Sequence, residues 1–296
     1  MSEARGGLLL GLGAYVLWGV LPLYFRLLDG IAPLEILSHR VVWSVVLLAI
    51  LVTALRRWPA IRGALTLRTL AFLATSAVLI AINWLIYIWA VETRHTIAAS
   101  LGYFINPLVN VGLAVMVLGE RLRRWQGVAI GLAAAGVLAM AGVALDTLWI
   151  SLALALTFGV YGLLRKVVAI DALGGLTVET VLLAPPAIVC LLAIGRDGAA
   201  FRGDWHLDGL LLLLGVVTAL PLLMFAASAR RLPYSTLALL QFVAPTLQFL
   251  VAVMVFGEPL RPLHALVFGL IWAGCILFAW DTIRAARLPD KSALLT

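Results

Sequence analysis

One stretch of this chain occurs twice, and it decides the fold. Residues Leu101–Gly136 read LGYFINPLVNVGLAVMVLGERLRRWQGVAIGLAAAG, and residues Leu239–Gly274 read LLQFVAPTLQFLVAVMVFGEPLRPLHALVFGLIWAG. Aligned without gaps, the copies lie 138 residues apart and share fifteen of thirty-six positions. A common apolar composition does not explain the shared polar and special residues, which include Pro107 and Pro245, Glu120 and Glu258, and Arg123 and Arg261. If each copy belongs to a half with an odd number of membrane spans, the halves face opposite ways, as in many secondary transporters.

The composition is that of an integral membrane protein. Of 296 residues, 64% are hydrophobic and 12% are charged, whereas soluble domains average about 45–50% and about 25%. Stretches near the ~20 residues needed to cross a bilayer predict an all-α protein with ten transmembrane helices. The predicted spans are 6–26, 33–55, 69–91, 97–118, 126–145, 147–164, 176–195, 207–228, 235–256 and 263–282.

The basic residues predict the orientation, because cytoplasmic loops of membrane proteins are enriched in Lys and Arg. With both termini in the cytoplasm, the outer loops hold five of the 21 basic residues and Arg40 lies inside the second span. The outer residues are Arg26, Arg94, Arg196, Arg202 and Arg261. The inner fifteen are Arg5, Arg56, Arg57, Arg62, Arg68, Arg121, Arg123, Arg124, Arg165, Lys166, Arg230, Arg231, Arg284, Arg287 and Lys291. The net charge of +7 follows from this bias and from anionic lipid heads, and no basic stripe with stacking aromatics indicates nucleic acid.

Five spans in each half divide the chain into a first repeat over 6–145 and a second over 147–283. The sequence Trp18-Gly19-Val20 in the first span corresponds to Phe158-Gly159-Val160 in the sixth. We therefore expect two inverted five-helix bundles that meet at mid-depth and open alternately to the two sides. No cleavable signal is evident, so the first apolar stretch is interpreted as a retained helix.

Polar side chains in the fourth and ninth spans predict where a substrate binds. Helical spacing places Tyr103, Asn106, Pro107 and Asn110 on one face, and Gln241, Pro245 and Gln248 on another. Because an amide facing lipid is costly, we expect both faces to point inward. The amides either line a substrate pathway or only bond neighbouring helices. Pro107 and Pro245 are candidate hinges, although membrane helices also tolerate proline without such a role.

Aromatic and basic residues within spans complete the candidate site. Trp18, Asn83, Trp84 and Tyr87 are expected to line the cavity. Arg40, next to His39, is costly at that depth and either extends to the outer surface or contacts an anion such as a substrate carboxylate. Glu35 and His39 are four residues apart and form a candidate titratable pair.

Several classes of function lack their signatures. No acidic residue is placed at mid-span, with Glu179 assigned to a helix end, so coupling through His39 or Glu35, exchange or facilitated export remain open. No HExxH, GxSxG or phosphate-binding glycine loop occurs, and we expect no enzyme activity, no cofactor and no metal. The group Asp204, His206 and Asp208 is interpreted as a solvated loop. Cys190 and Cys275 are interpreted as buried apolar residues.

Four segments carry a family resemblance: WGVLPLYFRLL in the first span, EILSHRVVWS in the second, NWLIYIWAVETRHTIAASLGYFINPL through the third and fourth, and GERL after it. They resemble the RarD group of the EamA-type drug/metabolite transporters, and the likeness extends to amino-acid exporters of the YddG type. The resemblance implies ten helices in two EamA repeats, a central cavity and export of small molecules across a bacterial inner membrane.

These observations predict an exporter of amino acids, including apolar or aromatic ones, that works by alternating access in the lipid bilayer. Trp18, Trp84, Tyr87 and Tyr103 would form apolar walls, the amides would orient the substrate, and Arg40 would hold its carboxylate. Export of lipophilic drugs or cations is the alternative, and a passive channel or an intramembrane enzyme is less consistent with the sequence. The oligomeric state, the exact substrate and the energy coupling are not determined by the sequence.

Overall fold

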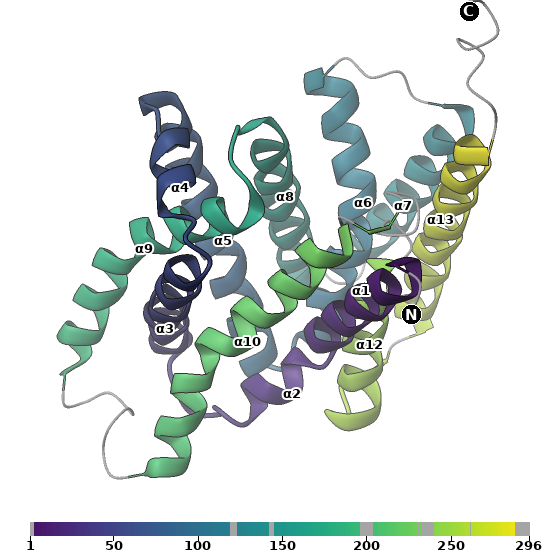
Figure 1. Cartoon of the computed structure of the whole chain (residues 1–296). Helices are drawn as coiled ribbons and strands as arrows, with labels where there is room; N and C mark the ends of the chain where they lie inside the picture. Colours follow the sequence, from purple (N-terminus) through teal and green to yellow (C-terminus); the bar gives the residue numbers. More distant parts are fainter. Residues whose placement is uncertain are drawn as a thin grey trace, which may run out of the picture.

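The computed structural model describes residues 3–118, 123–141, 145–195, 204–229, 231–232, 240–260 and 262–287, and within them it contains helices and turns without β-strands. The helices are packed side by side along much of their length (Figure 1). Those of the first half are α1 (Glu3–Gly19), α2 (Leu21–Arg26), α3 (Pro33–Ala54), α4 (Trp58–Ala64), α5 (Leu67–Glu92), α6 (Thr96–Leu118) and α7 (Arg124–Ala141). The second half contains α8 (Leu145–Val167), α9 (Ala172–Ile194), α10 (Trp205–Ala229), α12 (Val243–Leu250), the π-helix η2 (Val251–Val255) and α13 (Pro262–Arg287).

Eight of the ten predicted spans coincide with segments that are long and apolar enough to cross a membrane. These segments are Arg5–Arg26, Pro33–Ala54, Leu67–Glu92, Thr96–Val117, Asp146–Arg165, Ala172–Ile194, Trp205–Ser228 and His264–Asp281. The fifth and ninth predicted spans coincide with the shorter apolar helices Arg124–Ala139 and Val243–Val255. The protein is thus a multi-pass membrane protein, while the count of ten and the side on which each terminus lies stay predictions.

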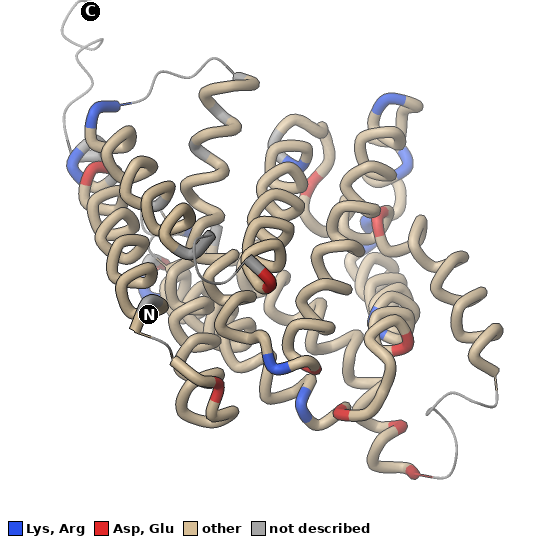
Figure 2. The backbone as a smooth tube through the Cα atoms, turned by 180° about the vertical axis from the view of Figure 1, so that it is seen from behind, with Lys and Arg blue, Asp and Glu red and all other residues tan. Residues whose placement is uncertain are grey.

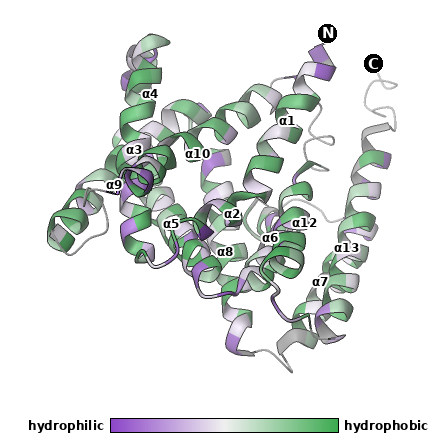
Figure 3. Cartoon of the chain, turned by 90° about the horizontal axis from the view of Figure 1, so that it is seen from below, coloured by the Kyte–Doolittle hydropathy of each residue, from purple (hydrophilic) through white to green (hydrophobic). Residues whose placement is uncertain are grey.

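Large apolar side chains face outward along these helices. Leu9 is 59% exposed, Ile50 62% and Leu192 75%. A water-soluble monomer rarely shows so much contiguous apolar surface, whereas lipid tails accept it without cost. Figure 2 shows few charged positions along the tube, and Figure 3 shows mainly hydrophobic colour along the helices.

Glycines let pairs of helices approach closely. On α13, a Cβ built on Gly274 would lie 2.8 Å from the backbone oxygen of Ala129 on α7. On α7, a Cβ built on Gly136 would lie 3.4 Å from the backbone oxygen of Val267 on α13. As residue numbers rise along one helix they fall along the other, so α7 and α13 run antiparallel, side by side in Figure 1.

Two other pairs run parallel. Gly11 faces Leu240 and Gly19 faces Leu247, so α1 and the segment around α12 run in the same direction. A Cβ on Gly102 of α6 would lie 2.7 Å from the backbone oxygen of Ser151 on α8, and Gly159 of α8 faces Val109 of α6. Parallel packing of α1 with α12 and of α6 with α8 therefore joins the first half of the chain to the second.

The first predicted span, 6–26, is divided in the structure. α1 ends at Gly19 and α2 begins at Leu21, with Pro22 in its first turn. Proline has no N–H and its ring clashes with the carbonyl four residues earlier, so the α-helix is interrupted before it. Pro22 thereby deprives the Trp18 carbonyl of its usual intrahelical donor.

Candidate functional site

Arg40 is buried in α3 with 5% of its surface exposed, so it does not extend to the outer surface. Its Nε donates a hydrogen bond of 2.9 Å to Thr218 Oγ1 on α10. Its guanidinium carbon lies 4.1 Å from the centre of the Trp84 ring on α5, a cation–π contact. One terminal nitrogen, Nη1, is buried without a hydrogen-bond partner among the described residues. Arg40 therefore has a positive charge and an unused donor within the helix bundle.

Aromatic rings continue from this arginine toward α8. Phe25 lies 6.0 Å from both the Arg40 guanidinium carbon and the Tyr87 ring centre. The Tyr87 and Tyr103 ring centres are 5.6 Å apart, and Tyr103 and Phe158 are 6.0 Å apart. The Tyr87 side chain is 2% exposed, and its hydroxyl has no hydrogen-bond partner among the described residues. The structure thus brings Arg40, Trp84, Tyr87 and Tyr103 together as predicted.

Asn83 connects this wall to α8. Its amide nitrogen donates to the carbonyl of Leu154 at 3.0 Å and to Thr157 Oγ1 at 2.9 Å, and its oxygen accepts from the Tyr103 hydroxyl at 3.0 Å. An asparagine has two N–H donors, so both are used here. Asn83 therefore orients Tyr103 and holds α5 against α8, which favours a supporting role over direct contact with a substrate.

Trp18 belongs to a second aromatic group. Its ring centre lies 5.3 Å from that of Tyr15 and 6.0 Å from that of Phe225 on α10. Its backbone carbonyl, which Pro22 leaves without a helical donor, accepts a hydrogen bond of 3.1 Å from Gln248 Nε2 on α12. Gln248 is 4% exposed, so this bond satisfies a carbonyl that lipid could not hydrate.

The remaining amides occupy different environments. Asn106 is 6% exposed, and its Oδ1, like Gln248 Oε1, has no hydrogen-bond partner among the described residues. Asn110 is exposed, contrary to the expectation that its whole polar face points inward. Its Oδ1 would lie 3.5 Å from a Cβ built on Gly159 and 3.8 Å from one built on Gly162. Because these two residues have no side chains, α8 provides no cover for Asn110.

The ninth predicted span differs from a single continuous helix. Leu240 is helical, Gln241 and Phe242 form a turn, and α12 begins at Val243, so Gln241 is half-buried ahead of the helix that carries Gln248. Pro245 would clash with the carbonyl of Gln241, four residues earlier, which accounts for the interruption there. The expectation that these residues share one helical face is therefore wrong.

The two candidate hinge prolines have different surroundings. Pro107 lies inside the continuous helix α6, whereas Pro245 lies in the first turn of α12. In a first turn, the missing N–H costs no intrahelical bond. The expected pair of matching kinks is thus replaced by one helix interior and one helix start, and the hinge role of either proline stays a prediction.

His39 and Glu35 are buried in α3, at 4% and 5% exposure. His39 interacts electrostatically with Glu35 and with Asp208 of α10. Asp204 begins α10: its Oδ1 accepts hydrogen bonds of 3.0 Å and 3.2 Å from the backbone N–H groups of His206 and Leu207. Within the described part of the chain, no group of three or more His, Cys, Asp or Glu residues is arranged to hold a metal ion.

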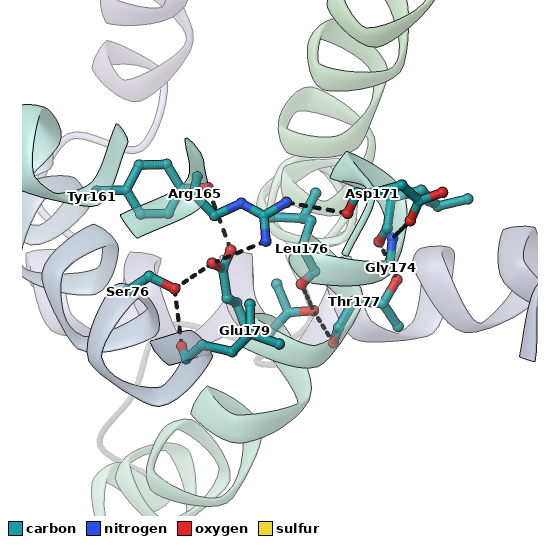
Figure 4. Close-up of polar contacts among 11 residues, drawn as sticks. Ser76, Tyr161, Arg165, Asp171, Gly174, Leu176, Thr177 and Glu179 are labelled. Carbon is teal, nitrogen blue, oxygen red and sulfur yellow. Dashed lines mark hydrogen bonds and ion pairs between the residues drawn. The ribbon is translucent and has the colours of Figure 1, made fainter. Parts of the chain in front are cut away.

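Sequence reasoning missed a second polar cluster, which lies around Glu179 of α9 (Figure 4). Glu179 is fully buried, and its carboxylate accepts hydrogen bonds from Ser76 of α5 and from Tyr161 of α8. Arg165 of α8 lies nearby, with Nη1 3.7 Å from Glu179 Oε1. We had assigned Glu179 to a helix end because the seventh span was predicted to begin at 176. α9 begins at Ala172, so Glu179 lies seven residues inside it, about 10 Å along the axis.

An open hollow of about 650 Å³ lies apart from both clusters. Its apolar wall comes from α2 and from the end of η2, and two arginines contribute to its lining. The lining residues are Val20, Leu23, Tyr24, Arg26, Leu27, Arg94, Val255 and Phe256. None of the predicted substrate-binding residues belongs to this lining.

Comparison with known proteins identifies the family. The EamA-like transporter family model matches residues 5–142. An uncharacterized transporter of Vibrio cholerae is 44% identical over 98% of this chain and 97% of its own length. Protein RarD of Escherichia coli is 42% identical over 98% of this chain and 99% of its own. Chloramphenicol-sensitive protein RarD of Pseudomonas aeruginosa is 38% identical over 99% of this chain and 100% of its own.

A solved crystal structure of another protein, 18% identical in sequence, has a TM-score of 0.58 and covers 92% of this chain and 96% of that one. This likeness shows the fold alone. The family, the near full-length relatives named as transporters and the eight apolar helices lead to one conclusion. The chain belongs to the EamA-like transporter family of the drug/metabolite transporter superfamily, whose members move small molecules across a lipid bilayer.

Proposed function

We propose that this protein exports amino acids, including apolar and aromatic ones, across the cell inner membrane by alternating access. The observation that carries this proposal is the buried Arg40, with an unused Nη1 donor beside the rings of Trp84 and Tyr87. A guanidinium binds a carboxylate through two parallel hydrogen bonds, and aromatic rings accept an apolar side chain. An amino acid presents both groups.

The machinery of this proposal is a pair of inverted repeats, 6–145 and 147–283. Glycine contacts support it, because they occur in related pairs. The contact of Gly19 with Leu247 has a counterpart in that of Gly159 with Val109. Leu247 and Val109 lie 138 residues apart, and Gly19 and Gly159 lie 140 apart. The contact of Gly11 with Leu240 has a counterpart in that of Ser151 with Gly102 at the same separations.

The contacts of α7 with α13 have the same relation. Gly136 and Gly274 lie 138 residues apart, as do the residues that they face, Ala129 and Val267. A two-fold axis in the membrane plane would exchange the two members of each such pair. Rocking of one repeat against the other about that axis would expose Arg40 and its aromatic neighbours first to the cytoplasm and then to the outside.

The test is counterflow in proteoliposomes at equal pH, with labelled amino acids inside and out. We expect free amino acids to compete strongly and their methyl esters weakly, because an ester has no negative charge for Arg40 to bind. Arg40→Lys should impair transport nearly as much as Arg40→Gln, since an ammonium cannot form the paired hydrogen bonds of a guanidinium. Arg62→Lys, on the exposed face of α4, is the matched control and should transport normally.

Equal competition by free acids and esters, together with an active Arg40→Lys variant, would exclude Arg40 from the binding site. The substrate class would then shift to lipophilic drugs or cations, which need no carboxylate partner. Non-saturable flux would instead indicate a channel.

A further inference from the structure

Glu179 is an acidic side chain inside a membrane-spanning helix, with 1% of its side chain exposed. A carboxylate in such a place is costly unless it is paired, and ionisable groups within membrane spans commonly serve transport. The partners of Glu179 come from three helices. Figure 4 shows Ser76 of α5 and Tyr161 and Arg165 of α8 directed at the Glu179 carboxylate of α9.

The pairing with Arg165 is loose. The 3.7 Å between Arg165 Nη1 and Glu179 Oε1 exceeds a hydrogen bond, and this nitrogen is buried without a hydrogen-bond partner among the described residues. Arg165 Nη2 donates instead to the backbone oxygen of Asp171 at 3.2 Å. The guanidinium lies over Gly175, where a Cβ would be 1.7 Å from Nη1. The arginine thus lies beside the carboxyl group without being bonded to it.

Ser76 accommodates either protonation state of Glu179. Its hydroxyl lies within bonding distance of two acceptors, Glu179 Oε1 and the backbone oxygen of Leu73 at 3.1 Å, but it has one hydrogen to donate. When Glu179 is ionised, Ser76 donates to the carboxylate. When Glu179 is protonated, the carboxyl O–H donates to Ser76 Oγ, and Ser76 donates to Leu73. Both arrangements are complete, so neither state leaves a polar group unbonded here.

The other groups around Glu179 are few. Among the described residues, its electrostatic neighbours are Arg165, Tyr161 and Ser76. α3 also packs against α9 but contributes no charged group to these neighbours. Asp171 is connected through Arg165, and it forms an ion pair of 2.5 Å with Arg57. One carboxyl group and one basic group therefore dominate this part of the bundle.

We propose that Glu179 is the proton-binding site that couples transport to a proton gradient. The proposal rests on the transport function above and assigns its energy source. Outside, after the substrate leaves, the Glu179 carboxylate takes a proton from water. Inside, the carboxyl O–H bond breaks, the proton passes to water, and the carboxylate closes on Arg165. One proton thus enters for each conformational cycle in which substrate leaves, and Arg165 links the charge on Glu179 to the position of α8.

The first experiment detects the proton and needs no substrate. Infrared difference spectra of the purified protein between acidic and neutral pH should contain a carboxyl C=O band that is lost in Glu179→Gln. Glu258→Gln is the matched control and should retain the band. Glu258 is also buried, but its carboxylate accepts backbone hydrogen bonds of 2.8 Å and 2.9 Å from Thr96 and Ile97, which favour the ionised form. A folded Glu179→Gln variant with an unchanged spectrum would overturn the proposal.

The second experiment separates coupling from transport. In proteoliposomes, an inward proton gradient should accelerate export by the wild type. Glu179→Gln, which resembles the protonated state, should lose this acceleration entirely and keep counterflow at equal pH. Wild-type counterflow without any response to the gradient would overturn the coupling proposal and leave the transport proposal intact. If no amino acid supports counterflow, the transport proposal fails, and the infrared band alone decides whether Glu179 exchanges a proton.

Discussion

At the scale of single residues, buried polar groups in this protein are largely satisfied by partners on distant helices. The Trp18 carbonyl is the clearest case, because Pro22 removes its helical donor and Gln248 supplies another at 3.1 Å. The bond joins two positions 230 residues apart in the chain. Lipid offers no hydrogen bonds, so such a carbonyl has to be satisfied within the protein.

We predict that Gln248→Leu destabilises the protein by about 1–3 kcal/mol, the cost of an unsatisfied buried acceptor. Pro22→Ala should reverse most of this loss, because alanine restores an N–H that can donate to the Trp18 carbonyl. Thermal unfolding of the two single variants and the double variant in detergent checks both statements. Additive effects of the two substitutions would show that the Trp18 carbonyl does not connect them.

At the scale of helices, close packing depends on a subset of the glycines. A Cβ on Gly274 would approach the Ala129 backbone oxygen to 2.8 Å, whereas one on Gly269 of the same helix would meet nothing within 4 Å. Backbone atoms cannot move away as the end of a flexible side chain can. The two glycines of α13 are therefore expected to differ strongly in their tolerance of a methyl group.

We predict that Gly274→Ala destabilises the contact between α7 and α13 by roughly 1–3 kcal/mol, as overpacking does. Gly269→Ala is the matched control and should be neutral or stabilising by about 0.5–1 kcal/mol, because alanine restricts the unfolded helix. Melting temperatures in one detergent compare the two variants directly. Equal melting temperatures would contradict the packing argument.

At the scale of the whole molecule, the distribution of basic residues predicts how the bundle lies in the membrane. Arg62 on α4 belongs to the predicted cytoplasmic side, and Asp29 after α2 belongs to the outer side. Both residues are exposed, so a reagent in the adjoining water can reach them. Of the earlier topology markers, Arg202 and Lys291 lie outside the described residues.

We predict that a cysteine introduced by Asp29→Cys reacts in intact cells with a membrane-impermeant maleimide. Arg62→Cys should react only after the membrane is permeabilised. The background should contain Cys190→Ala and Cys275→Ala, which remove both native thiols. Labelling of Arg62→Cys in intact cells would place the termini on the opposite side from the one that the basic residues indicate.

The sequence by itself determined the class of the protein, the positions of its apolar helices and the correspondence between its two copies. These features are local or repetitive: hydrophobic length sets a span, and an aligned Pro, Glu or Arg marks a copy. The sequence also indicated Arg40, Trp84, Tyr87 and Tyr103 as neighbours, because an intramembrane charge and aromatics at helical spacing tend to face the bundle interior.

The tertiary structure alone decided which polar groups meet. It separated Gln241 from the helix of Gln248, left Asn110 exposed beside glycines, and gave both amide hydrogens of Asn83 to α8. It also buried Glu179 between Ser76 and Arg165. The energy of a buried polar group depends on partners supplied by other helices. Those partners follow from how the helices cross and where each one starts, which hydrophobic periodicity does not specify.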